Sequence, residues 1–208
     1  MMTTTDTITT EVPQVFDVDT MADWLTTQRG LTAATFLTAV ARVGRRHGPH
    51  LLVQAVMAGS FGKAEGGFSW HSPALAEQAK ATASVWSDCD RPSWLLNGGD
   101  WTALFDVLGY TVDGVFADQP EEPIRLYRGA TEEGKHGMAW TSDLAMAEFF
   151  ATEYSKRAGV GKIYTAVIAP DHLLACITTR GEHEYVVDPA AFDPEGWEGV
   201  EVEEYITV

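Results

Sequence analysis

The segment "PIRLYRGA", residues 123–130, marks the point where the sequence changes from helical to β-type patterning. From here on, segments with strand-like composition alternate with turns, and they cover residues 123–130, 137–142, 162–169, 175–180, 182–188 and 200–208. One clear helical segment, residues 143–159, interrupts them. This mixture predicts that the second half of the chain is an α+β sheet domain.

The sequence before this segment has the signals of a helical region. Four polar residues precede apolar stretches of helical period, and we expect them to act as N-caps: Thr20, Thr32, Ser72 and Asp100. Residues 49–62 have the same helical composition. The sequence therefore predicts about five helices packed as a small bundle.

These patterns divide the chain into four parts. The fold class is predicted as α+β, with an N-terminal helical region followed by a sheet domain. Residues 113–123 hold two prolines and several acids, which is typical of a linker. The predicted division is a flexible Thr-rich leader at 1–14, a helical region at 15–112, this linker at 113–123 and the sheet domain at 124–208.

Composition restricts the compartment and the partners. The 208 residues are 45% hydrophobic, which supplies a proper core. Cys89 and Cys176 lie far apart, without metal-ligand spacing, so we expect a reducing, cytoplasmic environment and no metal. No apolar run reaches the ~20 residues of a membrane helix, and residues 1–14 have no basic start and no apolar run, so we do not expect them to act as a signal peptide. The formal charge of -16 makes nucleic acid and anionic membrane poor partners.

The acidic residues are unevenly distributed. Residues 181–208 hold nine carboxylates and no Lys or Arg. Two interpretations stay open: a surface that meets a basic protein partner, or a solvated face that keeps the chain soluble.

Two of these carboxylates flank a single residue in "GEHEYVVDP", residues 181–189. Side chains at i and i+2 leave a strand on the same face, so the strand pattern predicts that Glu182 and Glu184 project together. Two like charges on one face need a cationic or hydrogen-bonding partner, which favours a shared site. The alternative is an edge strand whose two acids are simply solvated.

Two further segments carry groups suited to a charged ligand. Arg128 and Gly129 end the strand at 123–130, so a guanidinium suited to a diphosphate stands beside a residue without a side chain, where a ligand can approach the backbone. Thr141 and Ser142 precede the helix at 143–159. Ser142 or Asp143 is the expected N-cap of that helix, which leaves the hydroxyl of Thr141 available.

These three segments, in this order, resemble the arginine, serine, glutamate class of mono-ADP-ribosyltransferases, which includes bacterial toxin and phage enzymes. The matching residues are Arg128 in "LYRGA", Thr141 and Ser142 in "AWTSDLAMAEFFA", and Glu182 and Glu184 in "GEHEYVVDP". The resemblance implies a split β-sandwich that clasps NAD in a cleft. Trp140 stands where the family's usual Ser-Thr-Ser motif begins, and Thr141 is expected to substitute for that serine.

The resemblance also implies roles. NAD is the substrate, bound by Arg128, Gly129, Thr141 and Ser142, and Arg128 would bind it without supporting the fold. Glu184 faces the ribose cation that develops when nicotinamide leaves, and Glu182 faces the acceptor. The E-x-E pattern is associated with arginine on a protein acceptor. Two alternatives stay open: NAD glycohydrolysis with water as acceptor, and a non-catalytic acidic protein-binding module on the same fold.

Overall fold

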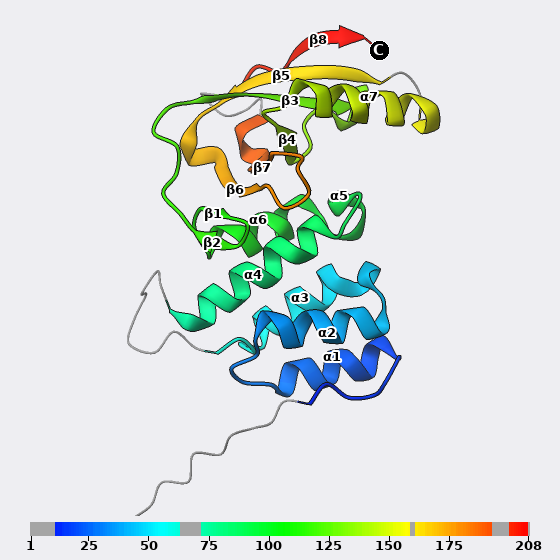
Figure 1. Cartoon of the computed structure of the whole chain (residues 1–208), viewed down its shortest axis with the longest axis vertical. Coiled ribbons are helices and arrows are strands. Elements are labelled where there is room, and N and C mark those ends of the chain that lie inside the picture. The colour runs from blue at the N-terminus through cyan, green and yellow to red at the C-terminus, as the bar shows by residue number, and fades with distance from the viewer. Residues whose placement is uncertain (1–10, 63–71, 159–160, 193–199, 208) are drawn as a thin grey trace, which may run out of the picture.

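The structure is a computed structural model that describes residues 11–62, 72–158, 161–192 and 200–207. Its helices are α1 (Val18–Thr27), α2 (Ala33–Val43), α3 (Gly48–Met57), α4 (Pro73–Ser87), α5 (Pro92–Leu95), α6 (Gly98–Asp106) and α7 (Leu144–Ala158). Figure 1 shows an elongated molecule with α1, α2 and α3 at one end and α7 at the other. The helix α4 lies between the two ends and reaches the sheet.

Two of the predicted helix caps are confirmed. The Thr32 side chain accepts a hydrogen bond from the backbone N–H of Thr35, and Ser72 accepts one from Leu75. In α4, Pro73 follows the cap at the first helical position, where its missing N–H costs nothing.

Two other helices begin three residues earlier than the sequence predicted. Asp17 caps α1 by accepting from the N–H of Thr20, and Asn97 caps α6 by accepting from the N–H of Asp100. Thr20 and Asp100 therefore lie in the first turn of their helices. An upstream Asp or Asn takes the cap position because its short side chain reaches the N–H three residues later.

The strands form one mixed sheet, and this confirms the predicted α+β class. They are β1 (Thr111–Val112), β2 (Val115–Phe116), β3 (Ile124–Ala130), β4 (Ala139–Thr141), β5 (Lys162–Ile168), β6 (Leu173–Ile177), β7 (Glu184–Val187) and β8 (Glu203–Thr207). Their order in the sheet is β2-β1-β6-β7-β4-β3-β5-β8. The pair β1 and β6 is parallel, whereas every other neighbouring pair is antiparallel.

The junction between β3 and β4 is the weakest point of this sheet. The two strands are in register at Tyr127 and Thr141 alone, while β3 and β5 pair along seven residues. The sheet is therefore nearly divided into one half that contains β6, β7 and β4 and another that contains β3, β5 and β8.

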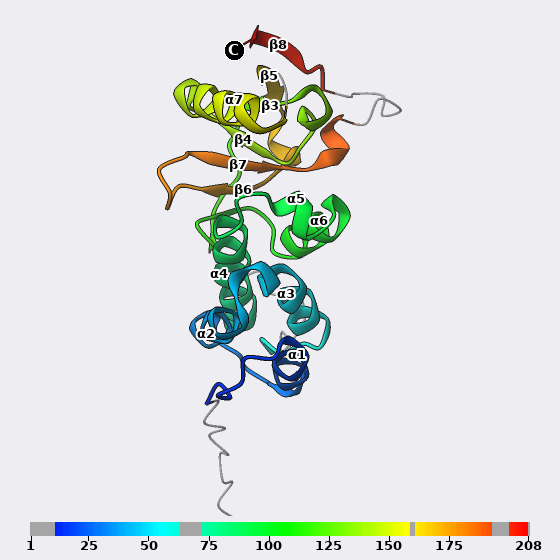
Figure 2. The ribbon, with the colours of Figure 1, turned by 90° about the vertical axis from the view of Figure 1, so that its right-hand side faces the viewer.

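Apolar side chains fill both sides of the sheet. One cluster lies between the two halves and includes Leu126, Trp140, Tyr164, Val187 and Phe192. On the outer sides, α7 packs on β3 and β5, and α4 and α6 pack near β6 and β7. Figure 2 shows α4 and α6 beneath β6 and β7, with α7 beside β3 and β5 at the far end.

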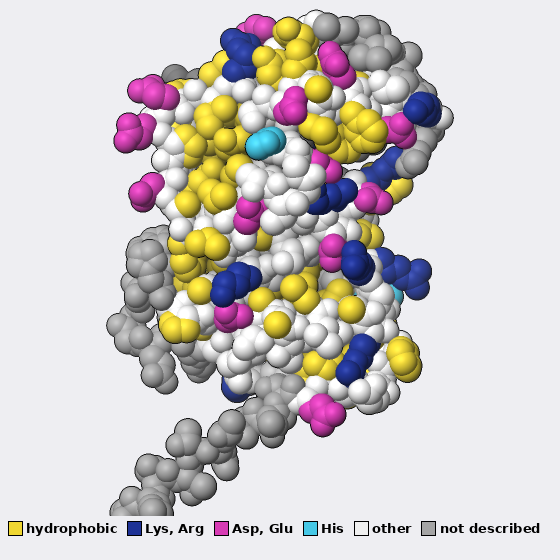
Figure 3. Space-filling view, viewed as in Figure 1, with side chains coloured by type: hydrophobic (Ala, Val, Ile, Leu, Met, Phe, Trp, Pro, Cys, Tyr) yellow, Lys and Arg dark blue, Asp and Glu magenta, His cyan; other side chains and the backbone are white. Residues whose placement is uncertain are grey.

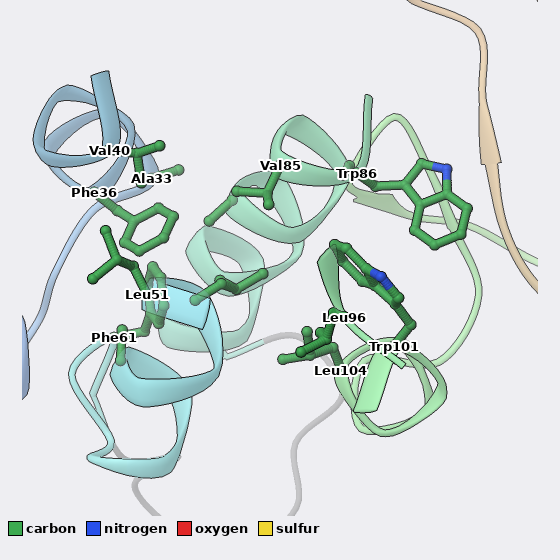
Figure 4. Packing of buried hydrophobic residues seen from close by; sticks show 14 of the residues in the cluster. Ala33, Phe36, Val40, Leu51, Phe61, Val85, Trp86, Leu96, Trp101 and Leu104 are labelled. Carbon is green, nitrogen blue, oxygen red and sulfur yellow. The ribbon is translucent and has the colours of Figure 1, made fainter. Parts of the chain in front are cut away.

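The helical region and the sheet share one hydrophobic core. The cluster that contains Phe36, Leu51 and Trp86 also contains Ile177 of β6 and Val186 of β7. Figure 4 shows part of this cluster, in which α4 carries Val85 and Trp86 between the N-terminal helices and α6. The helical region is therefore packed on the sheet domain as part of the same folded body.

The segment predicted as a linker contributes to the sheet. Residues 111–116 form the hairpin β1–β2, whose turn residues Asp113 and Gly114 have φ values of 51° and 75°. Left-handed residues are typical of a tight hairpin turn. The predicted leader, residues 1–14, lies mostly outside the described residues.

Two surface features bear on partners. Across the described residues, no helix combines the length and the apolar character needed to span a membrane. On the face shown in Figure 3, acidic side chains stand singly around the sheet half of the molecule. In the acidic C-terminal part, Glu204 is paired with Lys162 at 2.7 Å, so that part is not uniformly solvated.

Candidate functional site

The three segments singled out in the sequence lie on neighbouring strands. β7, β4 and β3 are adjacent in the sheet, although α7, β5 and β6 separate them along the chain. The register places Glu184 beside Thr141, and Thr141 beside Tyr127. Directly paired residues share a face, so Glu184 and Thr141 lie together on the side of the sheet that faces the helices.

Glu184 is a half-buried carboxylate held by the helical region. The indole Nε1–H of Trp86, in the last turn of α4, donates a hydrogen bond to its Oε1. Burial raises the pKa of Glu184 to about 7, and the charge of Glu182 adds to this rise. The hydrogen bond from Trp86 and the charges of Arg128 and Arg180 act in the opposite direction. Glu184 therefore changes its charge near neutral pH.

The strand β7 begins at Glu184, so the predicted alternation does not extend to Glu182. His183 has a left-handed backbone, with φ of 45°, and Glu182 lies in the turn before it. The argument that the two glutamates leave one strand on one face was therefore wrong. The turn still brings them close enough for the charge of Glu182 to raise the pKa of Glu184.

Glu182 has a cationic partner within its own turn. Its Oε1 lies 3.3 Å from Nε of Arg180, and its side chain is 16% exposed. Arg180 also donates from Nη1 to the backbone carbonyl of Ser87 at 2.6 Å. Glu182 is thus not a solvated edge-strand acid, and the end of α4 contacts the surroundings of both glutamates.

Thr141 is buried, and its hydroxyl joins two segments of the site. Oγ1 donates to the backbone carbonyl of Glu182 at 2.7 Å and accepts from the N–H of Asp143 at 3.0 Å. Thr141 thereby fixes the turn before β7 to the start of α7. The hydroxyl that the sequence left available is occupied by these two backbone groups.

The cap of α7 is Asp143. Its Oδ1 accepts from the N–H of Ala145 at 2.9 Å, and its carbonyl begins the helical hydrogen bonds. Ser142 is exposed, and its backbone N–H donates to the carbonyl of His183 at 3.3 Å. Of the two residues expected as the cap, Asp143 has this role, and Ser142 lies at the surface between β4 and β7.

Arg128 is half-buried and supports the loop between β3 and β4. Nε donates to the carbonyl of Gly134 at 2.8 Å, and Nη1 donates to the carbonyl of Ala139. A Cβ at Gly137 would lie 2.2 Å from Nη2, so this loop passes closely over the guanidinium. Arg128 is therefore part of the structure of this loop, whereas we had expected it to serve NAD binding alone.

Arg128 points to the opposite side of the sheet from its neighbour Tyr127, because adjacent strand residues alternate. Tyr127 packs beside α7, whereas Arg128 is paired in register with Tyr164 of the inner cluster. Its charge nevertheless lowers the pKa of Glu184. Arg128 is thus within electrostatic reach of Glu184 while its guanidinium lies on the inner side.

Gly129 is required for packing of α7. A Cβ at this position would lie 2.1 Å from the carbonyl oxygen of Ala147 and 2.4 Å from the backbone nitrogen of Ala151. The sequence interpretation assigned this space to a ligand, but the helix α7 fills it. Trp140 is a core residue: it is buried and stacks on Phe192 with 5.3 Å between ring centroids.

Comparisons with protein-family models, with curated proteins and with solved structures found no match. Two surface hollows, of about 430 and 210 Å³, are lined by other residues. The first lies around Trp94 between α3 and α5, and the second lies beside Arg125 and Glu203.

Sequence reasoning missed two residues of this site. Arg180 is close to Glu182 in sequence, so its position two residues before the first glutamate was an available signal. Trp86 precedes Glu184 by 98 residues and lies in a helix of ordinary apolar pattern. No local sequence pattern predicts that Trp86 contacts Glu184.

Proposed function

We propose that the protein is a mono-ADP-ribosyltransferase that transfers ADP-ribose from NAD to arginine on a protein acceptor, with release of nicotinamide, in the cytoplasm of a bacterial or infected host cell. The observation that carries this proposal is the adjacency of β7, β4 and β3, the strands that bear Glu184, Thr141 and Arg128. Strands distant in sequence need not be neighbours. Their adjacency supports the functional unit that the resemblance implies.

The near-division of the sheet supports the split β-sandwich that belongs to this proposal. β3 and β4 pair through Tyr127 and Thr141 alone, and an apolar cluster separates the two halves. NAD would enter where the halves diverge, next to Arg128 on one strand and the exposed Ser142 at the end of the other, while Thr141 fixes the turn before β7. The diphosphate would be bound by Arg128, after part of its bonding to the loop carbonyls is exchanged for phosphate oxygens.

Glu184 suits the carboxylate role in this reaction. Cleavage of the bond between ribose and nicotinamide develops positive charge on the sugar, and a fixed carboxylate stabilises that charge more in the transition state than in the ground state. A partly desolvated carboxylate interacts more strongly with such a charge than a solvated one does. Because its pKa is about 7, we expect Glu184 to act as the ionised form above neutral pH.

Glu182 suits the acceptor side. It already binds a guanidinium, that of Arg180, at 3.3 Å. A carboxylate that pairs with an incoming arginine can take the proton released when the guanidinium nitrogen bonds to the ribose carbon. No step of this chemistry requires a metal.

The test is incubation with labelled NAD, with agmatine as a small guanidine acceptor and with a cell lysate as a source of protein acceptors. Glu184→Gln should abolish both labelling and nicotinamide release, with a loss of about 100-fold or more. Glu182→Gln should lower labelling much more than nicotinamide release. Glu201→Gln, at an exposed acid of the same C-terminal region, is the matched control and should leave both unchanged.

NAD glycohydrolysis is the second candidate, and one contact favours it. The guanidinium of Arg180 already pairs with the carboxylate of Glu182. An acceptor arginine would have to displace it in order to bind Glu182, whereas a water molecule would not. Nicotinamide release without labelling of agmatine or protein would select this function. A protein that binds no NAD in calorimetry would instead support the non-catalytic acidic binding module.

A further inference from the structure

We propose that Trp86 is a positioning residue for Glu184, an indole N–H donor by which the helical region orients the carboxylate of the sheet domain. This inference rests on the proposed function for its catalytic meaning, while the contact itself is tested without NAD. It assigns to the helical region a part in the site that goes beyond packing.

The indole of Trp86 is itself rigidly held. It is 3% exposed and packs edge-on against Trp101, with 4.9 Å between ring centroids, and against Phe105, with 5.5 Å. In Figure 4 its indole nitrogen points away from Trp101 and out of the labelled cluster. A donor fixed by surrounding rings loses little entropy when it binds Glu184, and this is what a preorganised site requires.

The sheet domain does not use the hydroxyl of Thr141 to orient Glu184, because that hydroxyl has other hydrogen-bond partners. The resemblance assigns the orientation of the glutamate to a serine at the position of Trp140, which is buried in the inner cluster. Thr141 was expected to substitute for this serine, but its hydroxyl donates to the carbonyl of Glu182 and accepts from the N–H of Asp143. Trp86 supplies a hydrogen bond to Glu184 that replaces the one lost with that serine.

Two contacts from adjacent residues of α4 reach the pair of glutamates. Trp86 donates to Glu184 itself, and the carbonyl of Ser87 accepts from Arg180, which in turn pairs with Glu182. The end of α4 therefore fixes the environment of both carboxylates. A shift of this helix would change both at once.

The sign of the electrostatic effect gives this role a distinct signature. Around Glu184, burial and the charge of Glu182 raise its pKa, while the Trp86 hydrogen bond and the charges of Arg128 and Arg180 lower it. Loss of the indole N–H must therefore raise the pKa of Glu184 further. The ionised form then appears at higher pH, and activity lost at neutral pH returns at alkaline pH.

The experiment compares Trp86→Phe with Trp101→Phe. Trp101 belongs to the same aromatic cluster and also donates its indole N–H, but to the backbone carbonyl of Pro92 at 3.1 Å. Both variants lose one buried donor and part of a ring. We expect Trp86→Phe to move the acidic limb of NAD cleavage up by about one pH unit, and thus to lower the rate about tenfold below pH 7. Trp101→Phe should leave the limb in place.

A second measurement uses the protein without NAD and without a Trp86 substitution. The indole N–H resonance of Trp86 should shift with pH near 7 in the unmodified protein and should not do so in Glu184→Gln. A resonance that does not titrate would overturn the proposal whatever the enzyme assay shows, and so would equal, pH-independent losses in the two Trp variants. A titrating resonance in a protein that cleaves no NAD would support the contact while refuting the proposed function.

Discussion

The indole N–H of Trp86 and the carboxylate of Glu184 form a hydrogen bond that joins the helical region to the sheet across 98 residues of chain. Trp86 lies in the core cluster of the helices, and Glu184 begins the strand β7. The bond places a titratable group in a desolvated position, which costs stability whenever the group is charged.

This cost predicts that Glu184→Gln stabilises the protein at alkaline pH. The pKa of Glu184 rises from an ordinary 4.5 to about 7 on folding, so between these values the folded protein binds more protons than the unfolded chain. The contribution of Glu184 to stability therefore falls as pH rises through this window. Because glutamine accepts from Trp86 without a charge, Glu184→Gln should be more stable by about 3 kcal/mol at pH 8.

Urea denaturation at pH 4.5 and pH 8 measures this effect. The two proteins should be equally stable to within about 0.5 kcal/mol at pH 4.5, where Glu184 is protonated in the folded state and half protonated in the unfolded state. Glu201→Gln, at an exposed acid, should follow the unmodified protein at both pH values. A Glu184→Gln variant that is less stable at pH 8 would contradict the desolvated position of this carboxylate.

Arg128→Lys should lower both stability and NAD affinity. Arg128 donates to two carbonyls of the loop between β3 and β4, and the single ammonium of lysine cannot reproduce this fork. We expect a loss of about 1–3 kcal/mol in urea denaturation and weaker NAD binding in calorimetry. Arg125→Lys, at an exposed position of the same strand, should change the free energy of unfolding by no more than about 0.5 kcal/mol.

Local patterns predicted the strands from β3 to β8 and most helices of this protein, because strand composition, turns and caps are properties of neighbouring residues, but they missed the short hairpin β1–β2. The segments at 123–130 and 162–169, for example, correspond to β3 and β5. The start of β7 was missed because His183 adopts a left-handed backbone that composition does not reveal.

The site was predictable to a lesser degree. The order of Arg128, Thr141 and Glu184 in the sequence led to three strands that are neighbours in the sheet. The role of each side chain depends on contacts with residues that are distant in sequence, and local sequence patterns do not predict these contacts. The backbone of α7 leaves no room for a side chain at position 129, and the indole of Trp86 in α4 holds the carboxylate of Glu184 by a hydrogen bond.

Thr141→Val should damage the site, while Ser142→Ala should not. Valine preserves the shape of Thr141 but leaves the carbonyl of Glu182 and the N–H of Asp143 without their hydroxyl partner. We expect a loss of about 1–3 kcal/mol in unfolding free energy, with slower NAD cleavage because the turn before β7 loosens. Thr141→Ser keeps the hydroxyl and is the control. Equal effects of Thr141→Val and Ser142→Ala would show that the Thr141 hydroxyl has no special role.

Gly129→Ala should destabilise the fold severely. The added methyl group would meet backbone atoms of α7 at 2.1 and 2.4 Å, and backbone cannot rotate away as a side chain can. A cost of about 3 kcal/mol or more is expected in thermal or urea unfolding. The control is Gly134→Ala, whose methyl would make an ordinary 3.5 Å contact with Ala130. A Gly129→Ala variant as stable as this control would mean that α7 does not pack on β3 as described.

Arg180→Gln should shift the balance of the proposed reaction from hydrolysis towards transfer. Arg180 pairs with Glu182 at 3.3 Å, and its side chain is 42% exposed, so it competes with an acceptor guanidinium for the same carboxylate. Because an exposed ion pair of this kind contributes up to about 1 kcal/mol, the ratio of agmatine labelling to nicotinamide release should rise about two- to fivefold. Arg180→Lys keeps the charge and should give a smaller rise. Both rates are measured with the same labelled NAD at pH 8, above the pKa of Glu184, so that the loss of the Arg180 charge does not affect the result through that carboxylate. If the ratio fell instead, Arg180 would be holding Glu182 in place for the acceptor, and the competition between the two guanidinium groups would be refuted.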